Sequence, residues 1–202
     1  MTRIFLTLAS LSIILLVVAM TMGLSIGDLY AKPTASVETL QWATRHRLTG
    51  IAAAIVVILV ESIGYTYFVG TSRWCKEVVD TYQLDPAPVL ASNRLKRRSF
   101  PWALTGMLCV VGVASLGAAS DPATMQPNTQ AWASWHLAGA FMGIAFIAWT
   151  YVVIWNNIVA NQTITNQIVA DVGRYRDEQG LDLALSQPPA SESKGGGKSA
   201  KR

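Results

Sequence analysis

Four long apolar stretches constrain this chain more than any other feature of its sequence. They span residues 4–26, 48–70, 99–120 and 132–155, and together they contain one formal charge, at Glu61. Each is close to the roughly 20 residues that an α-helix needs to cross about 30 Å of hydrocarbon. Because only 14% of the chain is charged and all of those charges except Glu61 lie outside the stretches, a soluble globular domain is excluded. We predict an all-α membrane protein with four transmembrane helices in an antiparallel bundle.

The same stretches set the expected domain organisation. Residues 1–157 should form the transmembrane domain, with a cytoplasmic loop at 71–98. Its helices are expected at about 4–26, 46–70, 99–120 and 132–157. Apolar residues at loose helical spacing predict a cytoplasmic helical extension over 158–186. The segment 187–202 is rich in glycine, serine and lysine and predicts a disordered tail. We find no convincing internal repeat.

The distribution of lysine and arginine predicts the orientation in the membrane. Segment 121–131 carries neither residue, and 28–47 carries three. The basic residues of segment 71–98 are Arg73, Lys76, Arg94, Lys96, Arg97 and Arg98. By the positive-inside rule both termini are cytoplasmic, in the inner (cytoplasmic) membrane. Residues 4–26 exceed the 7–15 residues of a signal-peptide core, so we expect a retained first helix, with cleavage after Ala31 as the alternative.

The chain contains two histidines, and each opens an apolar run. His46 begins the second predicted helix and His136 begins the fourth, and both of these helices should run from outside to inside. Both side chains should therefore lie near the outer face. At 1.5 Å per residue, His46 and His136 lie at different distances from the inner ends of their apolar runs. They reach the same depth only if the fourth helix keeps Asn157 inside the membrane or one helix tilts. If they act together, their rings should lie within about 10 Å of each other.

Small residues share a helix face with each histidine. Gly50 and Ala53 lie within about 40° of His46 around the helix, and Ala140 and Gly143 lie equally close to His136. A flat macrocycle held between two helices needs such cleared surface, and neutral imidazole is a good iron ligand. We therefore assign the two histidines as candidate heme-iron ligands and the four small residues as cofactor contacts. The alternative is close packing of the second and fourth helices through the small residues.

The two histidine motifs also carry a resemblance to a known family. His46-Arg47 and His136-Leu137-Ala138 resemble the openings of the second and fourth helices in one four-helix half of heme A synthase. The resemblance covers about residues 44–155 and implies a b-type heme between the two histidines. The acidic residue that commonly precedes the His-Arg pair in that family is replaced here by alanine and threonine at positions 43 and 44. The catalytic activity of the family is therefore not implied.

Glu61 is a third candidate, because a carboxylate within a membrane span is costly and marks a functional site by default. We expect it to be protonated or hydrogen-bonded, to Tyr65, Ser62 or Thr150. A structural role and a proton-handling role both remain open.

Two functions from different classes fit these patterns. The first is a b-type heme protein for electron transfer or heme handling, associated with a respiratory oxidase. The second is a cofactor-free scaffold or accessory subunit acting through its basic loop and tail, with anionic lipid or a membrane subunit as partner. The basic residues that would make this contact are Arg94, Lys96, Arg97 and Arg98. We expect no nucleic-acid partner. An enzyme is disfavoured because no nucleophile–base pair or metal cluster is found.

Overall fold

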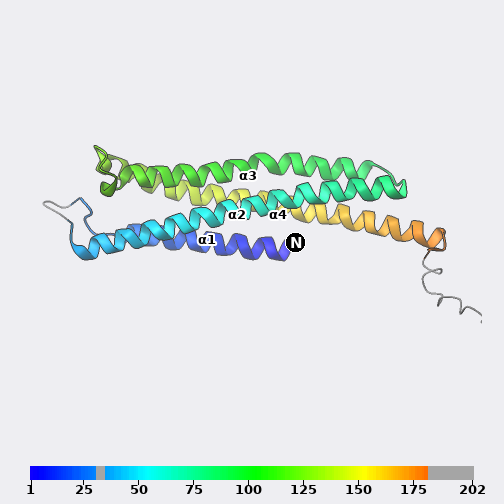
Figure 1. Ribbon diagram of the computed structural model, residues 1–202, viewed down its shortest axis with the longest axis horizontal. Coiled ribbons are helices and arrows are strands. Elements are labelled where there is room, and N and C mark those ends of the chain that lie inside the picture. The colour runs from blue at the N-terminus through cyan, green and yellow to red at the C-terminus, as the bar shows by residue number, and fades with distance from the viewer. Residues whose placement is uncertain (31–34, 182–202) are drawn as a thin grey trace, which may run out of the picture.

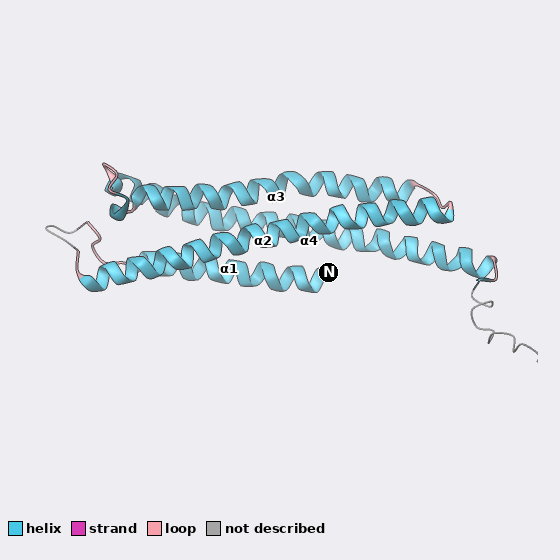
Figure 2. Cartoon of the chain, in the orientation of Figure 1, coloured by secondary structure: helices cyan, strands magenta, loops and turns pink. Residues whose placement is uncertain are grey.

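The computed structural model describes residues 1–30 and 35–181, and every regular element in that part of the chain is helical (Figure 2). The elements are α1 (Thr2–Leu24), α2 (Val37–Tyr82), α3 (Ala87–Ser120), the 3-10 turn η1 (Pro122–Thr124) and α4 (Thr129–Glu178). All four α-helices are long and apolar enough to span a membrane. The prediction of an all-α fold with four such helices is confirmed. The predicted tail, 187–202, lies outside the described residues.

Helices α2 and α3 are joined by a short turn, which corrects the prediction of a loop at 71–98. α2 continues to Tyr82, and a left-handed backbone at Gln83 (φ 52°) ends it. α3 begins at Ala87, so that Pro88 lies in its first turn. A proline there lacks only an N–H that would have no partner in the helix. Pro86 and Pro88 therefore mark a helix start, and between α2 and α3 only 83–86 is left as a loop.

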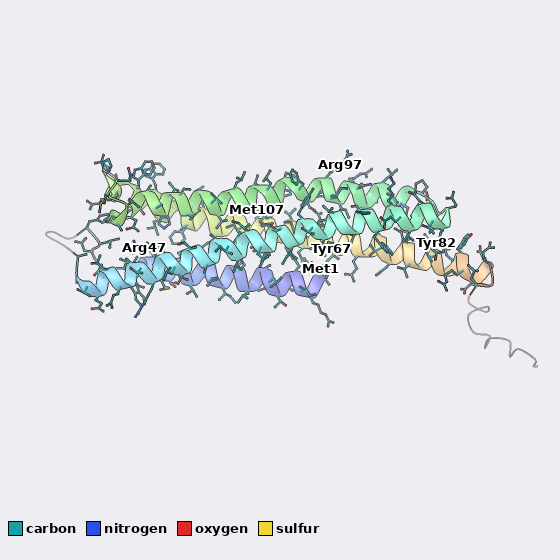
Figure 3. The ribbon with its side chains drawn as sticks, in the orientation of Figure 1. Met1, Arg47, Tyr67, Tyr82, Arg97 and Met107 are labelled. Atoms are coloured by element: carbon teal, nitrogen blue, oxygen red, sulfur yellow. The ribbon has the colours of Figure 1, made fainter. Side chains whose placement is uncertain are left out.

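The helices lie lengthwise along one another, and successive helices run in opposite directions (Figure 1). α1 packs on α2 and α4, and α3 packs on the same two helices. We call the end that holds His46 and His136 the histidine end, and the end with the 83–86 turn the hairpin end. α1 begins partway along α2, near the level of Tyr67 (Figure 3). Beyond that level α2, α3 and α4 are the helices that continue among the described residues.

This three-helix extension comprises residues 71–82, 87–98 and 158–178. It has a small apolar core of its own, built on Cys75 and Ile168, both fully buried. α4 passes from the apolar run into the extension without a break. The helix predicted from residue 158 is therefore the continuation of α4, and it ends at Glu178 rather than at 186.

The polarity of the array is distributed as in a membrane protein. Its outer surface is lined with leucine, isoleucine, valine and tryptophan, whereas buried polar groups lie between the helices. These interior polar residues are Ser12, Glu61, Ser72, Ser92, Ser99, Ser120, Thr150, Asn157 and Asn161. In a lipid phase, polar groups placed inside find partners that the bilayer does not offer.

The two hairpins α1–α2 and α3–α4 are structural repeats, although the sequence shows no convincing repeat. Each position from 51 to 60 in α2 has the same degree of burial as the position 90 residues later in α4. Likewise Phe5, Ala9 and Ser12 of α1 are buried, as are Ser99, Ala103 and Gly106, 94 residues later in α3. The offset of 90 relates His46 to His136. The two histidines thus occupy equivalent places in the two hairpins.

Candidate functional site

The two histidine rings meet in the interior of the histidine end. Their ring centres lie 6.1 Å apart and the ring planes are inclined by 66°. This separation is within the 10 Å limit expected for two groups that act together. Two imidazole nitrogens bound to one metal at about 2 Å each place the ring centres roughly 6 Å apart. The spacing of the pair therefore fits a shared metal ion, as well as a direct edge-to-face contact.

His46 is held against the end of α1. Its Nδ1 lies 2.9 Å from the backbone oxygen of Ala19, to which Nδ1–H donates in the matching tautomer. Within the described residues no hydrogen bond engages Nε2. A metal-bound histidine usually anchors its second nitrogen in this way, on a backbone carbonyl. His46 is thus oriented with Nε2 as its available ligand atom.

His136 occupies the corresponding place against the end of α3. It is half-buried, and its buried Nδ1 faces the backbone of Val113, the equivalent of Ala19, with a geometry that falls short of a full hydrogen bond. His136 is thus set against the backbone of Val113 in α3 as His46 is set against the backbone of Ala19 in α1.

Each ring rests on a glycine from the neighbouring helix, and sequence reasoning missed both. A Cβ at Gly23 would lie 2.9 Å from Cε1 of His46, and one at Gly117 would lie 3.0 Å from Cε1 of His136. The two glycines are 94 positions apart, as expected of equivalent positions in the two hairpins. No periodicity within one helix reveals them, because each acts on a side chain of another helix.

The four small residues chosen from the sequence differ in what they contact. A Cβ at Gly50 would meet nothing within 4 Å, and Ala53 is fully buried one turn further along α2. A Cβ at Gly143 would lie 2.8 Å from Val113 of α3, whereas Ala140 is half-buried. Packing of α2 on α4 through Gly50 and Gly143 is therefore wrong, because Gly143 admits α3. Gly50 leaves open surface beside His46.

Polar contacts tie the connections together around the histidine end. Arg47, the residue after His46, forms an ion pair of 2.6 Å with Asp121 at the end of α3. The Tyr30 hydroxyl donates to the backbone oxygen of Ser120 at 2.6 Å. Burial raises the pKa of this phenol, and the neighbouring Asp121 raises it further, so it stays a donor at neutral pH. These contacts fix the ends of α2 and α3 beside the histidine pair.

Glu61 lies far from the histidines, inside the middle of the array. It is fully buried, and Thr150 of α4 donates a hydrogen bond of 2.6 Å to its Oε1. Thr150 is one of the three partners expected from the sequence. Gly106 of α3 makes room for the carboxyl group, because a Cβ at this position would clash with Oε1. Oε2 is buried without a partner among the described residues.

Asn157 lies at the end of the last apolar run, and the predicted level of the two histidines depends on its position. The sequence left this open, because Asn157 ends the last apolar run. In the structure its side chain is buried, and Nδ2 donates to Oγ of Ser99 at 2.9 Å. α4 therefore keeps this amide between the helices, and the depth of Asn157 in the membrane stays a prediction.

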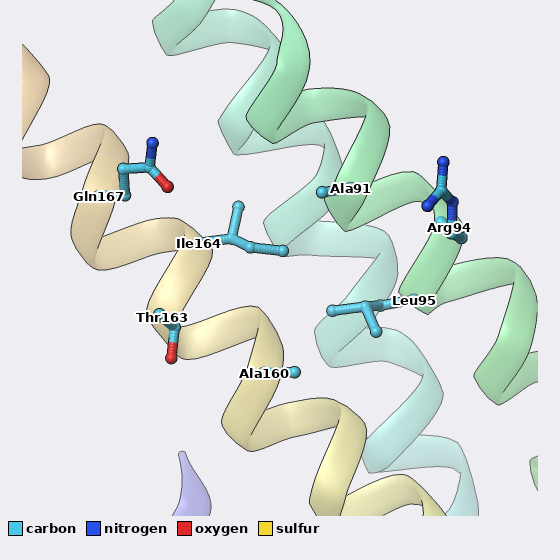
Figure 4. Close-up of a pocket in the computed structure, with 7 residues that line it drawn as sticks. All are labelled: Ala91, Arg94, Leu95, Ala160, Thr163, Ile164 and Gln167. Atoms are coloured by element: carbon cyan, nitrogen blue, oxygen red, sulfur yellow. The ribbon is translucent and has the colours of Figure 1, made fainter.

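The basic residues of the α3 segment lie in the three-helix extension, away from the histidine pair. Arg94, Arg97 and Arg98 are exposed and Lys96 is half-buried, and Arg97 points away from the other helices (Figure 3). A shallow groove of about 460 Å³ between α3 and α4 runs past Arg94 (Figure 4). Its other lining residues are Ala91, Leu95, Ala160, Thr163, Ile164 and Gln167.

No protein-family model, curated protein or solved structure matches the chain. The fold and the distribution of apolar surface define its class as a multi-pass membrane protein with four candidate spanning helices. Within that class, its distinguishing feature is a pair of histidines from equivalent helices, with ring centres 6.1 Å apart.

Proposed function

We propose that the protein holds one b-type heme between His46 and His136 and serves electron transfer or heme handling beside a respiratory oxidase. The observation that carries the proposal is the 6.1 Å separation of two imidazole rings placed by equivalent helices. When bound, a heme with two histidine ligands supplies a one-electron redox couple. Neither cysteine precedes a histidine in a C-x-x-C-H motif, which favours non-covalent attachment.

The protein's own residues account for binding and orientation. The Ala19 carbonyl fixes the His46 ring, and Gly23 and Gly117 give each ring its place against a neighbouring helix. The open surface at Gly50 offers room beside the iron ligands. Arg45 is exposed beside His46, where its charge favours a carboxylate of the macrocycle, whereas Arg47 is already paired with Asp121.

The proposed setting is the inner membrane, with both termini cytoplasmic and the four helices as an antiparallel bundle. This orientation rests on the lysine and arginine distribution. It places the histidine pair toward the outer face and the three-helix extension in the cytoplasm. A partner subunit for electrons or heme would then meet the pair from the outer half of the membrane.

Visible absorption spectra of the purified protein test the proposal. The reduced wild-type protein should give the sharp bands of a low-spin bis-histidine heme. His46→Ala and His136→Ala should each abolish or convert these bands, because each removes one of two axial ligands. Cys109→Ala, a substitution within an apolar run away from the pair, should leave them unchanged. Identical spectra for wild-type protein and both histidine variants would reject the assignment.

The second candidate function, a cofactor-free scaffold, is favoured by the groove beside Arg94 (Figure 4). This function predicts that Arg94→Glu releases a membrane partner while the histidine variants do not. If His46→Ala and His136→Ala retain partner binding and no heme is found, the scaffold function replaces the first.

A further inference from the structure

We infer that Glu61 is a reversible proton-binding site within the membrane, supplied from the hairpin end through a column of buried polar side chains. This inference does not depend on the proposed heme. Its first support is the carboxyl group itself, which is fully buried with one hydrogen bond, from Thr150, and a second oxygen that has no partner. Within the described residues no basic side chain pairs with it.

When a carboxyl group is buried without a cationic partner, its neutral, protonated form is favoured over the charged carboxylate. The titratable group that faces Glu61 is Tyr151 of α4, and the two groups interact electrostatically. The Tyr151 hydroxyl also forms a 2.9 Å hydrogen bond with the hydroxyl of Ser12 in α1, in which either group can be the donor. α3 contributes Gly106, which has no side chain and adds no charge. The neutral, protonated form then has an O–H on Oε2 that is free to pass its proton on.

The second support is the polar column toward the hairpin end. Asn157 bonds to Ser99, and one turn further along α4 Asn161 bonds to Ser92 and to Thr71 at 2.8 and 2.9 Å. Asn161 also reaches the Tyr67 hydroxyl at 3.3 Å. Tyr67 and Thr71 are half-buried and lie near the level where α1 begins, so the column ends at accessible surface. No comparable column joins Glu61 to the histidine end in the described residues.

One apolar step separates the carboxyl group from this column, and within the column no hydrogen bond among the described residues joins Asn157 to Asn161. Thr150 and Asn157 are seven residues apart on α4, about 10 Å along the helix. For a proton to cross this step, water molecules must enter it transiently and hydrogen-bond to Oε2. Binding of a proton converts the carboxylate to a neutral acid, and release of the proton restores the carboxylate. The site therefore needs no other reactant.

Infrared spectroscopy of the full chain in lipid vesicles tests the inference. A protonated carboxyl group gives a C=O band apart from the amide bands, and that band shifts when its proton is replaced by deuterium. The wild-type band should be lost in Glu61→Gln and should shift in Glu61→Asp, which keeps the acid. Transfer to D₂O should shift the wild-type band reversibly.

Variants of the column test the supply route. Ser99→Ala, which removes the partner of Asn157, should slow deuterium exchange of the band about tenfold, the rate equivalent of one net hydrogen bond. Ser115→Ala, at an exposed serine of the same helix, should leave the exchange rate unchanged. A spectrum that Glu61→Gln does not alter would overturn the proton site. A band that never exchanges, or that exchanges equally fast in both serine variants, would overturn the route.

Discussion

Single small residues decide where the functional side chains of this protein lie. Gly23 and Gly117 leave room for the two histidine rings, and Gly106 leaves room for the Glu61 carboxyl group. Other glycines of the same helices have no such task, because a Cβ at Gly112 would meet nothing within 4 Å. This difference supplies matched pairs of substitutions, in which the helix is the same and only the contact differs.

Gly117→Val should weaken heme binding strongly. The added side chain would enter the space of the His136 ring and turn the ring from its present direction. Gly112→Val places the same side chain on the same helix, facing open space. Heme content per protein, measured after purification, should fall in the first variant and not in the second. Equal losses would show that the glycine contact with His136 is unimportant.

Gly106→Ala should destabilise the protein by about 1–3 kcal/mol, the usual cost of overpacking an interior. The cause is the contact of its Cβ with Oε1 of Glu61, so the cost should largely vanish when Glu61 is already alanine. Thermal or denaturant unfolding in detergent measures this double-mutant cycle. An unchanged cost in the Glu61→Ala background would mean that another neighbour resists the new methyl group.

At the scale of elements, the apolar runs predicted which segments are helices but not how far α2, α3 and α4 extend beyond the runs. An apolar run ends at the first polar or charged residues of the sequence. A helix ends where its backbone N–H and C=O groups no longer form hydrogen bonds within the helix. α2, α3 and α4 continue past their runs because they pack on one another around Cys75 and Ile168. That packing depends on contacts between segments far apart in sequence, which local patterns do not contain.

The three-helix extension should be stabilised by its own core without affecting the histidine pair. Ile168→Ala removes a fully buried side chain from that core and should cost about 2–5 kcal/mol. Val169→Ala, at the exposed neighbouring position, should cost much less. Unfolding in detergent gives the stabilities, and the absorption spectrum of the folded protein should be the same for both variants. A changed spectrum in Ile168→Ala would show that extension and histidine end are coupled.

At the scale of the whole molecule, two equivalent hairpins bring equivalent histidines together. The sequence predicted that both lie at one end of the membrane, because direction alternates from helix to helix. It did not predict that their rings meet, since this requires Gly23 and Gly117 from the other two helices. It also did not reveal the repeat, because the hairpins share their pattern of burial while few residues are identical.

The proposed orientation predicts which end of the array is accessible from outside the cell. In a background with Cys75 and Cys109 replaced by alanine, Gln126→Cys should react with a membrane-impermeant thiol reagent in intact cells. Ala87→Cys, at the hairpin end, should react only after the cells are opened. Both positions are exposed, so burial does not confuse the comparison. The opposite pattern would invert the orientation.

The central claim is that His46 and His136 bind one heme, and the ratio of heme to protein tests it most directly. The protein should be purified from membranes of heme-replete cells, with heme quantified as its pyridine complex and protein by amino-acid analysis. The account predicts about one b-type heme per chain, since there is one histidine pair. Protein that is folded and monodisperse but contains no heme, and takes up none when titrated with hemin, would contradict it.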